Sequence, residues 1–367
     1  MGFNCGIVGL PNVGKSTLFN ALTATAAAQA ANFPFCTIEP NVGRVSVPDE
    51  RLAKIAEIAG SAEILPAQLE FVDIAGLVKG ASQGEGLGNQ FLSNIRETDA
   101  IIHVVRCFED DDIHHVEGSV DPLRDIETIE TELMLSDLES LTRQLENLKK
   151  KTRSGDKEAI AQYDFIAKIK AALDEGNSAR TVEATDEDEE RWLKVASLIT
   201  SKPILYVCNV SEEEAADGNA YSETVAKMAQ EQGAQSVVIC ASIESEIAQL
   251  ESDEEQAEFL ETMGLSEPGL NRIIRAGYTL LKLHTYFTAG PKETRAWTIA
   301  IDTKAPQAAG VIHTDFEKGF IKAETIAYDD YIACKGEQGA KDNGKMRQEG
   351  KEYVVANGDI ILFRFNV

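Results

Sequence analysis

The sequence predicts an α/β protein with a doubly wound, mostly parallel sheet, an inserted antiparallel helical hairpin and a small C-terminal α+β domain. Three observations support this fold class. Apolar, strand-like runs recur along the chain, and each ends just before a polar motif. A long segment with leucines at heptad spacing separates the fourth run from the fifth, and a glycine-rich, turn-rich segment closes the chain. We therefore place the sheet domain at 1–130 and 200–282, the hairpin at 131–199 and the last domain at 283–367.

The sheet is predicted from the order of the apolar runs and from the polar motifs at their ends. The runs are Asn4–Val8, Val42–Val47, Leu69–Val72, Ala100–Arg106, Ile204–Cys208 and Ser236–Cys240. Polar motifs at the ends of successive strands, with helices between the strands, are typical of a parallel sheet whose ligands bind at the carboxyl edge.

The composition of the chain limits the cellular compartment and the classes of partner that we expect. The chain has 367 residues, of which 43% are hydrophobic, which is enough for two or three domains with real cores. It has no run of 18 apolar residues and begins directly with a strand, so we expect no membrane span and no signal peptide. Its six cysteines form no Cys-x-x-Cys pair, which favours a reducing cytoplasm and argues against a zinc site. The net charge of −26 argues against nucleic-acid binding by the whole surface, although residues 283–367 hold 11 basic and 12 acidic side chains.

A phosphate-binding loop follows the first strand. Its sequence is Gly9-Leu10-Pro11-Asn12-Val13-Gly14-Lys15-Ser16, and Thr17–Leu22 continues it as a helix. In such a loop the backbone N–H groups surround an oligophosphate, Lys15 reaches the β- and γ-phosphates, and the Ser16 hydroxyl binds Mg²⁺. We assign the phosphate contacts to Asn12, Val13, Gly14, Lys15, Ser16 and Thr17.

Two later motifs have the features of γ-phosphate sensors. Asp73-Ile74-Ala75-Gly76 follows a strand, so Asp73 is expected near Mg²⁺ and the Gly76 N–H near the γ-phosphate. Thr37 is expected to add a second hydroxyl to the metal. The predicted Mg²⁺ ligands are therefore Ser16, Thr37 and Asp73.

The group that orients the attacking water is not where many GTPases carry it. Leu77 follows Gly76, and a leucine cannot hydrogen-bond the water that a glutamine would orient. His114 and His115 follow the next strand and are the nearest candidates, with surface or packing histidines as the alternative.

The base-reading motif decides between guanine and adenine. GTPases use Asn-Lys-x-Asp, whereas this chain has Asn209-Val210-Ser211-Glu212. The lysine stem is absent and the carboxylate lies one methylene further out, which spoils a geometry matched to guanine. We therefore predict ATP as the ligand, with Asn209 and a backbone group near Val210 facing the adenine edge and Glu212 at the same end of the site.

The inserted segment is predicted to be a helical hairpin. The seam consists of Met134, Leu138, Leu141, Leu145 and Leu148, spaced 4, 3, 4 and 3 residues apart. A basic, turn-like tip is predicted at Lys149–Asp156. A second helix is marked by Ile160, Tyr163, Ala167, Ile169 and Leu173, and the acidic run 186–190 opens a return helix through Trp192, Val195 and Ile199. The alternatives are an ordinary amphipathic helix and a solvated turn.

These motifs together resemble the YchF subfamily of Obg-like P-loop ATPases over essentially the full length of the chain. The motifs are Gly9–Ser16, Asn32–Asn41, Asp73–Ala81, Asn209–Glu212, Glu267–Asn271, Thr285–Gly290, His313–Phe320 and Lys335–Lys341. The resemblance implies a G-type P-loop NTPase domain, an inserted coiled-coil hairpin and a C-terminal TGS domain with a β-grasp-like fold. It also implies ATP hydrolysis, ribosome association and a link to translation or stress control, and it assigns assistance in hydrolysis to His115.

The leading hypothesis is thus a cytoplasmic, Mg²⁺-dependent ATPase switch that reports its state to the ribosome, either the large subunit or the 70S particle. Lys15, Gly76 and His115 are its expected catalytic groups. Lys149–Arg153 and the C-terminal domain, through Lys335–Lys351, are the expected rRNA contacts. The alternatives are a GTPase of the Obg class and a ribosome or RNA adaptor that uses nucleotide only for regulation.

Overall fold

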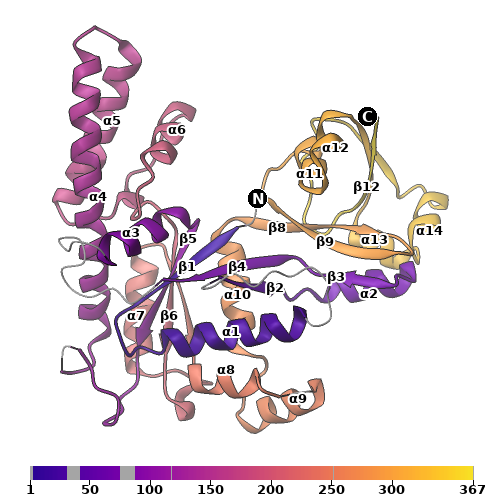
Figure 1. The fold of residues 1–367 in the computed structure, drawn as a ribbon. Helices are drawn as coiled ribbons and strands as arrows, with labels where there is room; N and C mark the ends of the chain where they lie inside the picture. Colours follow the sequence, from indigo (N-terminus) through magenta and orange to yellow (C-terminus); the bar gives the residue numbers. More distant parts are fainter. Residues whose placement is uncertain (1–2, 31–41, 75–86, 117, 251, 367) are drawn as a thin grey trace. The chain divides into compact units, whose positions relative to one another are not determined.

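The computed structural model describes residues 3–30, 42–74, 87–116, 118–250 and 252–366 (Figure 1). Contacts within the chain divide it into two compact units. One comprises Asn4–Gly43 and Phe71–Ile273, and the other Met1–Phe3, Arg44–Glu70 and Ile274–Val367. The segment Arg44–Glu70 thus groups with the C-terminal part of the chain, although it belongs to the sheet domain by the boundaries that we predicted from the sequence.

The first sheet has the strand order β2-β4-β1-β5-β6-β7. The neighbours β1 and β5, β5 and β6, and β6 and β7 pair in parallel, which confirms the predicted doubly wound class. The strands are β1 (Asn4–Val8), β2 (Val42–Ser46), β4 (Gln68–Asp73), β5 (Ala100–Arg106), β6 (Ile204–Asn209) and β7 (Gln235–Ile239). The helices of this unit are α1 (Lys15–Ala30), α3 (Leu87–Glu97), α7 (Ala220–Glu231), α8 (Ala241–Ile247) and α9 (Asp253–Thr262), and α10 (Gly269–Leu280) continues from it into the other unit at Ile274.

The strand order reverses beside β1. From β1 the chain builds β2 and β4 on one side of the sheet, and then β5, β6 and β7 on the other. Ligands of doubly wound sheets bind in the crevice at this point, outside the carboxyl ends of the strands. The loop that follows β1 therefore lies where a ligand is expected.

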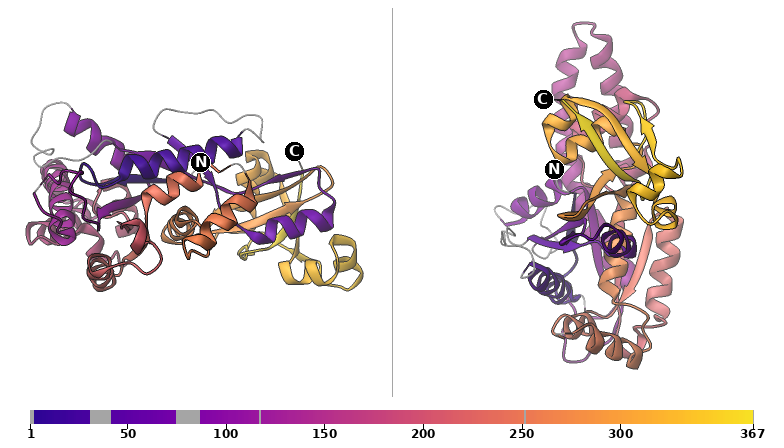
Figure 2. Two further views of the ribbon diagram at one scale, coloured as in Figure 1. Left: turned by 90° about the horizontal axis from the view of Figure 1, so that it is seen from below. Right: turned by 90° about the vertical axis from the view of Figure 1, so that its right-hand side faces the viewer.

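Two long antiparallel helices, α4 (Pro122–Thr152) and α5 (Lys157–Asp174), form the hairpin and extend away from the sheet (Figures 1 and 2). Asp121 caps α4 through the Arg124 N–H, and Pro122 stands at its first position, where a proline costs no hydrogen bond. The helix continues to Thr152, so the prediction of a turn from Lys149 onward was wrong. Three lysines in the last turn are favourable at the negative end of the helix dipole.

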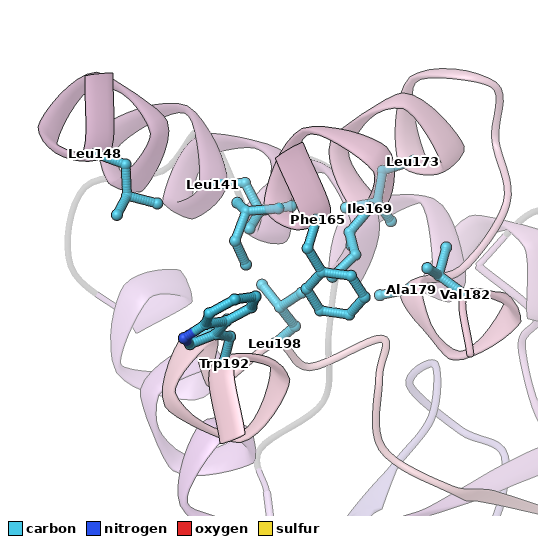
Figure 3. Packing of buried hydrophobic residues seen from close by; sticks show 11 residues of the cluster. Leu141, Leu148, Phe165, Ile169, Leu173, Ala179, Val182, Trp192 and Leu198 are labelled. Carbon is cyan, nitrogen blue, oxygen red and sulfur yellow. The ribbon is translucent and has the colours of Figure 1, made fainter. Parts of the chain in front are cut away.

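A separate apolar cluster holds the hairpin together (Figure 3). Leu141 and Leu148 of α4 are buried with Phe165 of α5 and with Trp192 of α6 (Glu187–Ala196). The other three seam residues, Met134, Leu138 and Leu145, pack against this cluster, which confirms the seam. Ile160 and Val195 lie in α5 and α6 as predicted, although they are 40% and 70% exposed. The return helix ends at Ala196, so its predicted extension through Ile199 was wrong. A short 3₁₀ turn, Ala179–Thr181, connects α5 to α6.

A buried histidine in β5 makes the stability of the chain depend on pH. His103 is 2% exposed and packs beside Tyr206 of β6. Burial lowers the pKa of His103 from its ordinary value of 6.5 to about 4, while the nearby Glu130 opposes this shift and Arg180 adds to it. The folded state therefore favours the neutral ring.

We expect the stabilising preference for neutral His103 to be full above the unfolded pKa of 6.5 and to be lost as the pH falls towards 4. A shift of this size corresponds to about 3 kcal/mol of unfolding free energy. Denaturant titrations between these pH values should show a shallower acid limb for His103→Gln than for the unaltered chain. Parallel limbs would contradict the assignment.

The second unit contains a mixed sheet of the order β11-β10-β12-β8-β9-β3. Its strands are β3 (Glu63–Leu65), β8 (Leu283–Ala289), β9 (Glu293–Ala300), β10 (Phe320–Ile326), β11 (Arg347–Glu349) and β12 (Ile360–Phe365). Its helices are α2 (Glu50–Ala59), α11 (Ala305–Ile312), α12 (Thr314–Lys318), α13 (Tyr328–Ala333) and α14 (Glu337–Asp342). Tyr286, Phe320 and Phe363 form its core with alanines of α11, consistent with the predicted α+β class.

None of the helices within the described ranges is both long enough and apolar enough to cross a bilayer.

Candidate functional site

The phosphate loop lies between β1 and α1, as its sequence predicts. Gly14 has a φ of +92°, and a Cβ at this position would collide with the amide of Asn209. Asn12 has a φ of +62°, a conformation that asparagine tolerates better than most residues. The N–H of Leu18 donates to the carbonyl of Gly14 at 2.9 Å and so starts the helix directly after the loop. The loop therefore leads into a helix N-terminus, which favours an anion.

Lys15 and Asp73 meet although 58 residues separate them. Lys15 Nζ lies 2.7 Å from Asp73 Oδ1, and the lysine is 8% exposed. Ser16 and Thr17 are exposed beside it. A serine hydroxyl and an aspartate carboxylate are hard oxygen ligands, so this donor set fits Mg²⁺ with phosphate and water completing the shell. Two predicted partners, Thr37 and Gly76, lie outside the described residues.

Asn209 is held by the protein on both sides of its amide. Its Nδ2 donates to the Val13 carbonyl at 3.0 Å, and its Oδ1 accepts from the Ala241 N–H at 2.9 Å. The residue is 4% exposed, and it joins the phosphate loop to the segment after β7. An amide has two N–H donors and two lone pairs on its oxygen, so a contact to a base by Asn209 would use the second N–H or the second lone pair of Oδ1.

Val210 differs from the lysine of a guanine reader in position as well as in chemistry. Its side chain is buried, at 2% exposure, and its N–H donates to the Ile239 carbonyl at 2.8 Å. It cannot extend over a base as a lysine stem does. A hydrogen bond between a ligand and the Val210 backbone would have to be accepted by the Val210 carbonyl oxygen.

Glu212 is fixed by a neighbour that the sequence did not indicate. It begins the 3₁₀ turn Glu212–Glu214, and its Oε1 accepts from the Ser242 hydroxyl at 3.0 Å. The last carboxylate of this turn, Glu214, accepts from the Ser211 hydroxyl, and this hydrogen bond lowers the pKa of Glu214. Glu212 is therefore held by Ser242, and it lines the same pocket as Lys15.

The two candidate histidines have different environments. His115 is 7% exposed, and its Nε2 lies 2.8 Å from Asp125 Oδ2 in α4. His114 is exposed, and its carbonyl accepts from Asn12 Nδ2 of the phosphate loop at 3.1 Å. His114 thus contacts the phosphate loop through its backbone, while the predicted residue, His115, faces a buried carboxylate.

Most of the predicted contact residues surround one pocket of about 1060 Å³. The predicted residues that line it are Asn12, Gly14, Lys15, Ser16, Thr17, Asn209, Val210 and Glu212. Val13, Asp73 and His115 are not part of this lining. Val13 is 2% exposed and contributes through the carbonyl that Asn209 binds.

One wall of the pocket was missed from the sequence. Phe108, Glu109, Asp110 and Ile113 line it, in the loop after β5. Arg106 at the end of β5 donates to three carbonyls of this loop, and an arginine that ends a mostly apolar strand was the available signal in the sequence. Asp125, which contacts His115, was also missed, and its only signal in the sequence is that it lies near the start of a helix.

Comparisons with known proteins agree with this geometry. A family model described as "50S ribosome-binding GTPase" matches residues 4–153, and the YchF-GTPase_C model, described as a protein of unknown function, matches residues 283–366. Proteins named "Ribosome-binding ATPase YchF" are similar over 100% of both chains, with 59% identity in Haemophilus ducreyi and 55% in Bacillus subtilis. The structure titled "Structure of the Schizosaccharomyces pombe YchF GTPase" is 40% identical, has a TM-score of 0.89, and the match covers 99% of this chain and 98% of that one. The chain therefore belongs to the YchF family.

Proposed function

We propose that the chain is a Mg²⁺-dependent ATPase switch that acts in the cytoplasm and associates with the ribosome. The proposed preference for ATP is supported by the arrangement of the residues at the base end of the pocket. Val210 is buried where GTPases extend a lysine, and Glu212 is hydrogen-bonded to Ser242. A reader with this geometry has lost the paired contact to guanine that gives GTPases their discrimination.

The phosphate end supports hydrolysis of a triphosphate. The Lys15 ammonium contacts the β- and γ-phosphates, and its ion pair with Asp73 holds the Asp73 carboxylate next to them. When bound, Mg²⁺ supplies charge neutralisation to the phosphates, held by Ser16 and Asp73 together with Thr37. Gly76 and His115 complete the proposed catalytic set, with Gly76 as γ-phosphate sensor and His115 orienting water.

The names of the similar proteins point to two different nucleotides, ATP and GTP. The curated relatives are named ATPases, whereas the 50S ribosome-binding family model and the Schizosaccharomyces pombe structure carry the word GTPase. A GTPase is therefore the second candidate function. The geometry of Val210 and Glu212 favours adenine over this alternative.

The proposed ribosome contact lies at the end of the hairpin, where the chain is locally basic. Lys149, Lys150, Lys151 and Arg153 are all exposed there, on a chain whose net charge is −26. Contacts between such a cluster and rRNA phosphates make binding sensitive to salt. We propose that this cluster and the C-terminal unit contact rRNA on the large subunit or the 70S particle.

Reversing the hairpin charges should weaken ribosome binding without changing nucleotide affinity. In cosedimentation at low salt, the triple variant Lys149→Glu/Lys150→Glu/Lys151→Glu should lose about tenfold or more in affinity and show a shallower salt dependence. The control Lys168→Glu/Lys170→Glu places the same kind of change within α5. Equal binding by all three proteins would rule out the hairpin contact, and ATP turnover unaffected by ribosomes would argue against the switch.

A further inference from the structure

Arg106 is a buried arginine whose donors go to the backbone of one loop. It is 2% exposed. Its Nε donates to the Phe108 carbonyl at 3.1 Å, Nη1 to that of Ile113 at 2.9 Å and Nη2 to that of Asp110 at 3.2 Å. The guanidinium also lies over the Phe108 ring, 4.5 Å from its centroid. One side chain thus gathers three carbonyls from six successive residues.

The held loop joins the two ends of the nucleotide pocket. At the base end, the Cys107 N–H donates to the Asn209 carbonyl at 2.8 Å, and Tyr221 Oη donates to Glu109 Oε1 at 2.6 Å. At the phosphate end, Asn12 Nδ2 donates to the His114 carbonyl. Between these anchors, the residues held by Arg106 line the pocket.

The chemistry of the contact requires arginine. A charge removed from water is tolerated only when its hydrogen bonds are made, and the carbonyls of a loop need donors in the same way. The planar guanidinium presents several donors in fixed directions and stacks on an aromatic ring, whereas a lysine ammonium is a single point on a flexible stem. A lysine at position 106 would keep the charge and lose the arrangement of the three carbonyls.

We propose that Arg106 is a positioning residue that fixes this loop as the wall for the base and ribose of the nucleotide. The phosphates have their own partners in the phosphate loop and Lys15, so the contribution of Arg106 falls on the nucleoside. This proposal rests on the proposed function, because it takes the ligand of the pocket to be an adenine nucleotide.

The test compares two ligands by calorimetry in the presence of Mg²⁺, a non-hydrolysable ATP analogue and inorganic tripolyphosphate. For Arg106→Lys in the full chain, we expect the Kd of the ATP analogue to rise about tenfold or more, and that of tripolyphosphate to change less than about twofold. The matched control is Arg180→Lys. Arg180 bonds Glu130 and the Lys202 carbonyl, and neither lines the pocket. The Arg180→Lys variant should leave the affinities for the ATP analogue and for tripolyphosphate unchanged.

A second variant keeps the proposal testable if Arg106→Lys does not fold. Arg106→Gln removes the charge and keeps one amide group that can donate to the loop carbonyls, and it should give the same selective loss because Arg106 itself does not line the pocket. Equal losses for both ligands, or no loss for either, would overturn the proposal. The unaltered chain decides the proposed function separately. If it prefers a GTP analogue, the ATP proposal fails, and the comparison of Arg106→Lys with Arg180→Lys is repeated with that analogue.

Discussion

Replacing Lys15 with alanine is expected to reduce the affinity for a non-hydrolysable ATP analogue by about 100-fold or more, which corresponds to about 2.7 kcal/mol. Lys15 is the buried cation of the phosphate loop, and its Nζ lies 2.7 Å from Asp73 Oδ1. Without it, the negative charge of the phosphates faces the Asp73 carboxylate directly. Isothermal calorimetry with Mg²⁺ measures the loss.

The matched control is Lys170→Ala. Lys170 pairs with Asp174 one helical turn away on the surface of α5, and exposed pairs of this kind contribute little. This variant should bind the analogue as the unaltered chain does. Unchanged affinity of Lys15→Ala for the ATP analogue would contradict the proposal that the phosphate loop binds the triphosphate.

Replacing His115 with alanine is expected to lower the ATP turnover by about 100-fold while nucleotide affinity is retained, because a group that moves or orients a proton typically contributes this much. The same change should lower stability. Asp125 is 3% exposed, and the variant leaves this carboxylate with Arg124 but without its contact to His115 Nε2. Loss of such a buried partner costs about 1–3 kcal/mol.

The neighbouring histidine supplies the control. His114 is exposed and contacts Asn12 through its carbonyl, which alanine keeps. His114→Ala should therefore retain turnover and stability. A loss of turnover in His114→Ala with full turnover in His115→Ala would show that the wrong histidine was chosen, and full turnover in both would mean that water is oriented by another group.

The central strands of the first sheet were predictable because parallel strands that are buried on both faces form nearly continuous apolar runs. The runs Asn4–Val8 and Ala100–Arg106 appear in the structure as β1 and β5 with those bounds. The strand β3 was not predictable. Its three residues are mostly exposed, and its partner β9 lies more than two hundred residues later in the chain. Pairing of this kind is decided by tertiary structure and not by local pattern.

The end of the hairpin shows how a local rule can misplace a boundary. A run of lysines followed by glycine resembles a turn, but lysine is a good helix former and is favourable near a helix C-terminus. The helix therefore continues through Lys149–Lys151 and ends at Thr152.

The candidate site was predictable where its chemistry is local in sequence. The phosphate loop and Asp73 were visible as motifs, and the structure brings Lys15 and Asp73 into contact. Asn209 was identified by its motif, but its bonds to Val13 and Ala241 depend on three separate segments meeting. The sequence marked Arg106 only as an arginine at the end of a strand, and its acceptors could not be predicted because they are backbone carbonyls, which every residue carries.

The proposed ATP preference requires that the base end of this pocket no longer binds guanine in preference to adenine. Calorimetry of the Mg²⁺-loaded protein with non-hydrolysable ATP and GTP analogues tests it most directly. We expect clearly tighter binding of the ATP analogue, because Val210 is buried and Glu212 is held by Ser242. Tighter binding of the GTP analogue would contradict it and would make the chain a GTPase with an altered reader.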